Sequence, residues 1–187
     1  MSRKGHHSSV SPTEAIEGLR ERHRNRLRLR GTVTTLVVTA IVVFLTFGVF
    51  FKIAVVRGNS MVPAINNGDL ILTWRFSGSF QRGDVILFRL DGRELVKRVA
   101  GVPGDNITVE SRSGRLLVNG DIVDNAHNVA PTMPRPGSSV AYPMELDANE
   151  YFLLGDNRVT SDDSRSFGAV LKNMIDGKVI LLIRTGS

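Results

Sequence analysis

Cysteine is absent from this 187-residue chain, and only four histidines are present. The absence of cysteine excludes disulfides, zinc–thiolate sites and a cysteine nucleophile. It leaves the compartment open, because a cysteine-free chain can function in oxidising or reducing surroundings. The composition is otherwise that of an ordinary globular protein, which argues against disorder throughout the chain.

A basic surface over the body of the protein is also missing. The formal net charge is +6, but residues 1–31 carry +5 of it and residues 32–187 carry only +1. A basic body would have indicated nucleic-acid binding. The positive charge instead belongs to an N-terminal tail, and we do not expect nucleic acid as a partner.

The segment that follows this tail has no charged residue. Residues 32–51 read TVTTLVVTAIVVFLTFGVFF, and as a helix this segment would be about 30 Å long, the thickness of a bilayer core. A buried core helix is the alternative, but a core helix of this length usually carries more polar residues on its outer face. We therefore predict one transmembrane helix at residues 32–51.

The tail predicts the orientation of that helix. Six arginines lie between Arg20 and Arg30, and the positive-inside rule places such a segment in the cytoplasm. Arginines can also bind nucleic acid, but beside a membrane helix they favour a role in topology and anionic-lipid contact. No A-x-A cleavage site follows the apolar run, so we expect a retained anchor and an extracytoplasmic domain at residues 52–187.

The outer domain is predicted to be mainly antiparallel β-sheet. Short apolar or alternating runs are separated by turn residues, which is typical of strands. They lie at residues 53–57, 69–74, 84–90, 94–102, 106–110, 115–119, 150–155 and 178–184. Asn119-Gly120 is a strong hairpin signal. Residues 124–149 hold four of the seven prolines and are predicted to form a long surface loop.

A serine in the turn GNSMVP, Ser60, is a candidate nucleophile, and it needs a base to take its proton. Histidine is the usual base, but three of the four histidines lie in the tail, on the other side of the predicted membrane. Only His127 remains, within the proline-rich loop. A Ser–His pair is therefore an open alternative that the spacing supports poorly.

A lysine can replace histidine if burial lowers its pKa. The outer domain has four lysines: Lys52, Lys97, Lys172 and Lys178. Lys52 directly follows the anchor, where we expect its amine to extend to the membrane interface. Lys97 shares one strand face with Leu95 and Val99, so it is the candidate for a desolvated base. On spacing alone, an exposed lysine on an edge strand is the alternative.

A third stretch, GDNRVTSDDSRSFG at residues 155–168, is dense in hydrogen-bonding groups. Its carboxylates do not fit a calcium loop, because Arg158 occupies a ligand position. We predict a polar loop held by Asp–Arg pairs that supports a neighbouring site. No metal or cofactor is expected.

Four stretches in order, NSMVPAI, RGDVILFR, KRVAGVPGD and GDNRVTSDDSR, resemble the sequence boxes of bacterial type I signal peptidases. These membrane-anchored serine endopeptidases remove signal peptides with a serine/lysine dyad. The resemblance covers the anchor and nearly all of the outer domain. It implies that Ser60 is the nucleophile and Lys97 the general base.

The resemblance also implies roles for the residues around this dyad. Ser161 matches the serine that hydrogen-bonds the lysine and orients it. Asp163 and Arg165 match a supporting ion pair. Met61 matches a residue that packs against the lysine, and Pro63 shapes the turn.

Two further implications concern the support of the site. Asp156, Asn157 and Arg158 look structural, with Asp156 the one expected to reach the site. The oxyanion hole of the family uses the N–H of the nucleophile and a donor two residues earlier, where this chain has Gly58. Because glycine has no hydroxyl, we expect its backbone or a water to supply the second donor.

The expected partners follow from the resemblance as well. They are the signal peptides of secretory preproteins, the lipid bilayer of the plasma membrane and the vicinity of the secretion translocon. Trp74 and Phe76 are either interfacial or ordinary core aromatics. A soluble self-cleaving repressor and a non-enzymatic anchored binding module are the rival classes. The anchor argues against the first, and the joint presence of Ser60, Lys97 and Ser161 argues against the second.

Overall fold

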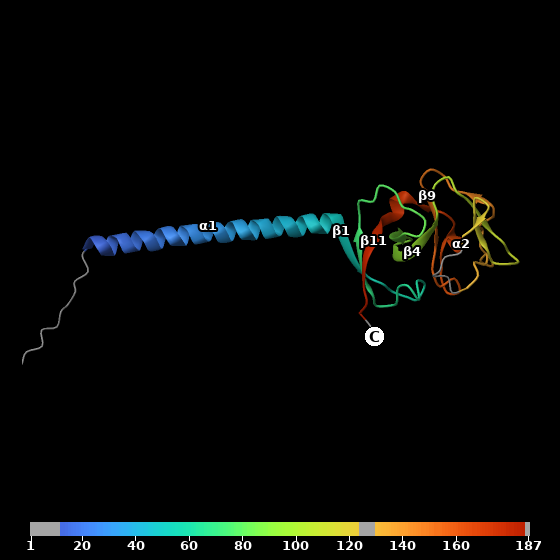
Figure 1. Ribbon diagram of the computed structural model, residues 1–187, viewed down its shortest axis with the longest axis horizontal. Helices are drawn as coiled ribbons and strands as arrows, with labels where there is room; N and C mark the ends of the chain where they lie inside the picture. The colour runs from blue at the N-terminus through green and yellow to red at the C-terminus, as the bar shows by residue number, and fades with distance from the viewer. Residues whose placement is uncertain (1–11, 124–129, 186–187) are drawn as a thin grey trace, which may run out of the picture. The chain divides into compact units, whose positions relative to one another are not determined.

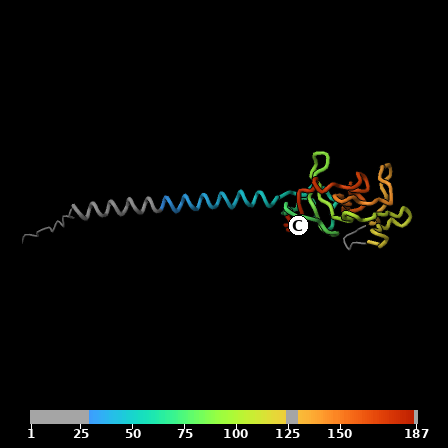
Figure 2. Tube along the Cα trace, turned by 90° about the horizontal axis from the view of Figure 1, so that it is seen from above, coloured from blue at the N-terminus to red at the C-terminus, as the bar shows by residue number. Residues whose placement is uncertain are grey.

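The computed structural model describes residues 12–123 and 130–185, with side chains from residue 29 onward. Helix α1 (Pro12–Phe50) runs without interruption, and a compact unit rich in β-structure begins at Gly48 (Figure 1). The trace in Figure 2 shows the same helix followed by a densely folded chain. Within the described residues the body is mainly antiparallel β-sheet, as predicted.

Within α1, Leu29–Phe50 is long and apolar enough to cross a membrane, with a mean hydropathy of 2.5. None of this segment is buried inside the protein. The hydroxyls of Thr35 and Thr46 donate to carbonyl oxygens one turn earlier, so these polar groups are satisfied without water. A single apolar N-terminal helix was predicted, and it ends at Phe50 because Phe51 begins the first strand.

The larger sheet has seven strands in the order β1-β2-β11-β3-β4-β9-β10, and every neighbouring pair is antiparallel. These strands are β1 (Phe51–Val55), β2 (Leu70–Trp74), β3 (Val85–Leu90), β4 (Arg93–Gly101), β9 (Glu150–Leu154), β10 (Val170–Leu171) and β11 (Ile175–Ile183). A smaller sheet has the order β7-β6-β5-β8. Its strands are β5 (Asn106–Val109), β6 (Leu116–Val118), β7 (Asp121–Ile122) and β8 (Met144–Glu145).

All eight predicted strands are present. The β6–β7 hairpin turns at Asn119 and Gly120, which have φ values of 56° and 88°, as an Asn-Gly turn requires. The predicted loop at 124–149 is irregular where it is described, apart from the two residues of β8. The short elements α2 (Ser164–Phe167), η1 (Lys172–Met174) and β10 lack a periodic signal, and the sequence did not predict them.

Three clusters of buried apolar side chains hold the body together. One of them places Met61 and Ile65, from the turn after β1, beside Ile71 of β2 and Leu87 of β3. Full burial of such a side chain contributes about 1.5–3 kcal/mol. The turn that carries Ser60 is therefore anchored in the core on its C-terminal side.

Aromatic rings gather where the body begins. Trp74 stacks on Phe50 with ring centroids 5.5 Å apart and meets Phe51 edge-on at 5.0 Å. Phe76 contacts Phe50 at 5.0 Å but is 58% exposed. Phe76 is thus not a core residue, which removes that alternative, and its insertion into a membrane interface stays a prediction.

Candidate active site

The Ser60 turn begins where β1 ends. The N–H of Val56 donates to the carbonyl oxygen of Asp69 at 2.8 Å, and the N–H of Gly68 returns a bond to the carbonyl oxygen of Val56 at 2.9 Å. These bonds close the loop at its base, while Met61 and Ile65 bury its far side. Ser60 is left at the rim with its side chain partly exposed, where a substrate can reach it.

Lys97 lies against Ser60. Its Nζ is 2.8 Å from the Oγ of Ser60 and 3.2 Å from the carbonyl oxygen of Val96, and the residue is only 2% exposed. Burial lowers the pKa of Lys97, although the negative charges of Asp163, Asp162 and Asp156 oppose this shift. The exposed edge-strand alternative for Lys97 is therefore wrong. The amine is buried within reach of a serine hydroxyl.

The neighbouring residues show why burial dominates at Lys97. Leu95 and Val99 pack in one core cluster and Val96 in another, so the predicted alternation of faces along β4 is confirmed. Arg98 binds both oxygens of Asp156, at 2.8 and 2.6 Å. A dedicated cation thus already compensates the charge of Asp156. Within the described residues, no carboxylate forms an ion pair with Lys97.

The loop after β9 is built around a second paired carboxylate. Arg165 binds both oxygens of Asp163, at 2.8 and 2.9 Å, and both residues are buried. Arg165 also donates to the carbonyl oxygen of Arg158 at 2.7 Å, and Asp163 accepts from the N–H of Gly155 at 3.1 Å. The predicted ion pair is present, and through its bonds to Gly155 and Arg158 it ties distant parts of this loop together.

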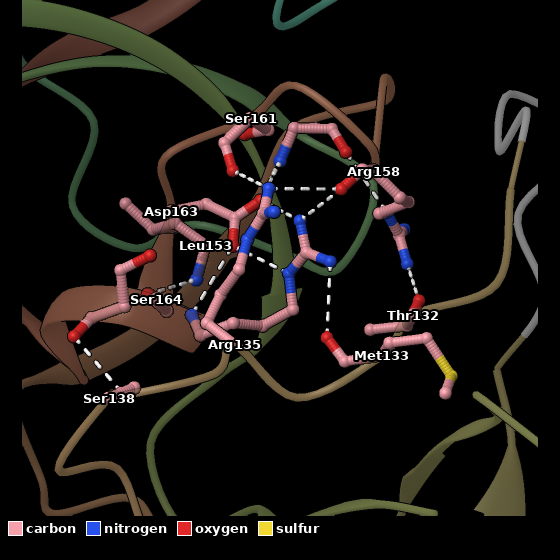
Figure 3. Close-up of polar contacts among 12 residues, drawn as sticks. Thr132, Met133, Arg135, Ser138, Leu153, Arg158, Ser161, Asp163 and Ser164 are labelled. Atoms are coloured by element: carbon pink, nitrogen blue, oxygen red, sulfur yellow. Dashed lines mark hydrogen bonds and ion pairs between the residues drawn. The ribbon is translucent and has the colours of Figure 1, made fainter. Parts of the chain in front are cut away.

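Sequence reasoning missed Arg135, which clamps the same loop from outside. Its guanidinium donates to the carbonyl oxygens of Ser161 and Arg158 (Figure 3). It also donates to the carbonyl oxygen of Val159. Nearby, Arg158 donates to the hydroxyl of Thr132. Arg135 lies in an irregular, proline-rich stretch, and no local pattern predicts which distant segment such a residue contacts.

Asn157 joins this loop to the Ser60 turn. Its N–H donates to the carbonyl oxygen of Ser60 at 3.0 Å, and its Nδ2 donates to that of Asn59 at 3.2 Å. Asp156 was expected to be the member of this motif that reaches the site. Asp156 binds Arg98 and its charge acts on the pKa of Lys97, while the adjacent residue Asn157 holds the nucleophile turn. A direct contact of Asp156 with the site stays a prediction.

The hydroxyl of Ser161 is fully buried but has no hydrogen-bond partner in the described part of the chain. The expected bond to Lys97 is thus not formed, and the Lys97 amine contacts Ser60 and Val96 instead. A Cβ at Gly155 would collide with the Ser161 hydroxyl and lie 2.5 Å from the carbonyl oxygen of Ser60. Ser161 therefore lies beside the nucleophile turn, and its orienting role stays a prediction. The packing of Met61 against the lysine also stays a prediction.

Gly58 adopts a φ of 91°, which favours glycine. Its N–H donates to the Oδ1 of Asn67 at 2.9 Å. This N–H is therefore engaged by Asn67 in the present structure, and the choice between the Gly58 backbone and a water as second oxyanion donor stays a prediction. The N–H of Ser60 itself donates to no acceptor within the described residues.

A groove of about 650 Å³ leads to Ser60 and Lys97. One wall is formed by residues 53–57 and the other by residues 92–97, with Leu87 between them. In the part of the chain that the structure describes, β1 is the last strand of its sheet, and residues 93–97 of β4 pair only with β3, because pairing with β9 starts at Arg98. Two strand edges that pair with no further strand among the described residues therefore border the groove.

Two further expectations concern groups other than the lysine. No cluster of three metal-ligating side chains occurs among the residues that the structure describes. His127 lies outside the described residues, so the geometry does not test a Ser–His pair.

A serine hydroxyl and a buried amine at the end of a groove bordered by two strand edges are suited to peptide hydrolysis. Residues 29–183 match the family model for signal peptidase, peptidase S26. Signal peptidase I S of Bacillus subtilis (strain 168) is 32% identical over 152 residues, which cover 76% of this chain and 82% of that protein. Signal peptidase I of Bacillus caldolyticus is 36% identical over 155 residues, which cover 75% and 84%.

A crystal structure of a signal peptidase I from Enterococcus faecalis V583 is 29% identical, with a TM-score of 0.45, covering 55% of this chain and 97% of that one. From the family match and the relatives, the chain belongs to the signal peptidase family, peptidase S26, and is a serine endopeptidase. The resemblance seen in the four sequence boxes is confirmed. The self-cleaving repressor and the non-enzymatic module are not favoured.

Proposed function

We propose that this enzyme removes N-terminal signal peptides from secretory preproteins with Ser60 as nucleophile and Lys97 as general base. The observation that carries the proposal is the 2.8 Å contact between Lys97 Nζ and Ser60 Oγ at a buried lysine. Burial favours the neutral amine, which has the lone pair that a base needs.

In the proposed reaction, the neutral amine of Lys97 takes the proton of the Ser60 hydroxyl as Oγ attacks the carbonyl carbon of the last signal-peptide residue. The resulting ammonium returns a proton to the leaving amine of the mature protein, and an acyl-enzyme remains. Lys97 then takes a proton from the water that attacks the ester carbonyl, and its ammonium returns a proton to Ser60 Oγ as the C–O bond breaks and the signal peptide leaves as a carboxylic acid. The N–H of Ser60 is one donor to the oxyanion of each tetrahedral intermediate.

The groove supports binding of the substrate as an extended strand. Its two bordering edges, in β1 and β4, run in the same direction, because four antiparallel steps separate them in the sheet. A segment between them can therefore pair with both by main-chain hydrogen bonds. Ala54, Val56 and Val96 are apolar residues on its walls, which suits small apolar side chains such as those of an A-x-A motif.

The apolar segment of α1 supports a membrane-anchored enzyme, with the basic tail in the cytoplasm and the body outside the plasma membrane. Confinement of the enzyme and a membrane-tethered signal peptide to one surface raises their effective concentration. Such an enzyme would work close to the secretion translocon.

The test is cleavage of a preprotein by the full chain in vesicles. We expect Ser60→Ala and Lys97→Ala each to abolish cleavage without unfolding the body. Ser113→Ala and Lys178→Ala replace an exposed serine and a partly exposed lysine elsewhere, and they should retain activity. Activity that survives in either dyad variant but is lost in His127→Ala would establish a Ser–His mechanism instead.

The proposed role in secretion and the proposed membrane orientation are tested in cells. The gene should complement a cell depleted of signal peptidase, and N-terminal sequencing of the secreted proteins should map cleavage after the A-x-A motif. Protease added to intact spheroplasts should degrade the body and leave the N-terminal tail intact. The opposite pattern would contradict the orientation.

A further inference from the structure

Lys52 is placed differently from the sequence expectation. It is the second residue of β1, and its Nζ lies 2.6 Å from Glu94 Oε1 and 2.7 Å from Asp176 Oδ2. Its side chain is 23% exposed, so it does not extend freely towards a membrane interface. The amine instead links β1 to β4 on one side and to β11 on the other.

Arg89 completes the cluster around Lys52. Its guanidinium lies 3.0 Å from Asp176 and 3.7 Å from Glu94, so two cations and two carboxylates share this site. Burial alone would lower the pKa of Lys52, but its hydrogen bonds to Asp176 and Glu94 raise it above the ordinary value. The pKa of Lys52 is therefore higher than that of Lys97, so Lys52 keeps its charge at a pH where Lys97 has already lost its proton.

The Lys52–Glu94 pair joins the two strands that border the groove. Glu94 lines the groove and lies three residues before Lys97 on β4, a separation of about 10 Å along a strand. Period two puts Lys52 on the same face of β1 as Ala54 and Val56, and Glu94 on the same face of β4 as Val96. The ion pair thus marks the end of the groove that is remote from Ser60.

The role of this ion pair follows from the width that a bound substrate strand needs. A strand inserted between two edges requires them to stand about two inter-strand spacings apart, on the order of 10 Å. The long side chains of a lysine and a glutamate can bridge such a width, whereas shorter pairs cannot. Among the described strands β1 is otherwise paired only with β2, so without the bridge its distance from β4 is less constrained.

We propose that the Lys52–Glu94 ion pair is a substrate-positioning strut. It holds the two groove edges apart by the width that one inserted strand needs. The proposal rests on the function proposed above. It also assigns the groove a length, because the strut lies about three residues from the dyad. The three residues before the scissile bond then lie extended between the edges, and the chain beyond them leaves the groove at the strut.

The test compares Glu94→Gln with the wild type in steady-state cleavage of a signal-peptide substrate by the full chain in detergent micelles. Glu94→Gln removes the charge that reaches across the groove and keeps the Lys52–Asp176 bond. We expect KM to rise about fivefold, as for loss of a partly exposed ion pair, with kcat and its pH profile unchanged. Lys52→Met should raise KM in the same way as Glu94→Gln. Lys52→Arg keeps the positive charge and should have a KM close to that of the wild type.

Lys178→Gln is the matched control, because it removes the Lys178–Asp84 ion pair of 2.7 Å outside the groove. Its KM should equal that of the wild type. High salt should raise the KM of the wild type and leave that of Glu94→Gln unchanged, since screening weakens the strut. If the ion pair only stabilises the fold, Glu94→Gln should lower the melting temperature without raising KM at constant kcat.

Two outcomes overturn different claims. If cleavage depends on Ser60 but Glu94→Gln keeps the KM of the wild type, or if kcat falls in proportion, the strut is disproved and the dyad stands. If Ser60→Ala still cleaves, the proposed function itself fails.

Discussion

The N–H of Asn157 donates a hydrogen bond to the carbonyl oxygen of Ser60 at 3.0 Å. This bond connects the polar loop after β9 to the turn that carries the nucleophile, although the two segments lie far apart in sequence. The same loop contains the Asp163–Arg165 ion pair and is fastened by Arg135. The position of the Ser60 main chain therefore depends on a loop whose buried carboxylates, Asp156 and Asp163, are each paired with an arginine.

Gly155 is expected to be essential because this contact is so close. In Gly155→Ala the new Cβ would lie 2.5 Å from the carbonyl oxygen of Ser60 and collide with the Ser161 side chain. We expect a loss of roughly 1–3 kcal/mol in the free energy of unfolding and at least a tenfold fall in kcat. Denaturant unfolding and preprotein cleavage measure both. Gly78→Ala, where a Cβ meets nothing within 4 Å, should change neither.

The pKa of Lys97 predicts how stability depends on pH. Because burial lowers this pKa, the unfolded chain binds more protons than the folded chain between the lowered value and 10.5. Lys97 therefore destabilises the folded state most below that window, and this destabilisation decreases as pH rises through it. Lys97→Met should therefore melt at a higher temperature than the wild type at pH 7, and the difference should shrink towards pH 10.5.

Circular dichroism melts of the solubilised protein at several pH values measure this difference. Lys178→Met, at a partly exposed lysine paired with Asp84, is the control for loss of a lysine outside the apolar site. A melting-temperature difference for Lys97→Met that grows with pH would contradict the assigned direction of the shift.

The buried Asp163–Arg165 pair predicts a non-additive response. Arg165→Met leaves the Asp163 carboxylate without its cation and should cost about 3–5 kcal/mol of folding free energy. The double variant Asp163→Asn and Arg165→Met should cost less than the single change. A double-mutant cycle from urea unfolding measures the coupling, and additive losses would show that the two side chains act independently.

Gly58 allows a direct test of the second oxyanion donor. A Cβ at Gly58 meets nothing within 4 Å, but its φ of 91° makes any side chain cost roughly 1–2 kcal/mol. Gly58→Ser and Gly58→Ala share this cost and differ by one hydroxyl. We expect kcat of the serine variant to exceed that of the alanine variant at least tenfold, as a new oxyanion donor would produce. Equal kcat values would show that the hydroxyl does not reach the oxyanion.

The sequence predicted most of the sheet because strands of five or more residues leave a clear apolar pattern. It predicted Lys97 because an amine on an apolar strand face is unusual. It did not predict the partners of Lys52, Arg135 and Asn157, because those partners lie on distant segments. The alternation of side chains along a strand predicts which face of the strand a residue occupies. It does not predict which other strand or loop packs against that face, because this depends on the folded sheet.

The direct pairing of β4 with β9 has a consequence for variation in this enzyme. The chain leaves the larger sheet after Gly101, builds the small sheet and returns at Glu150 beside the strand it left. Because both ends of this excursion are fixed in adjacent strands, its outer parts can change length without altering the distance between base and nucleophile. The β6–β7 turn at Asn119-Gly120 is therefore a suitable point for grafting a recognition module, whereas the stretch around Arg135 is not.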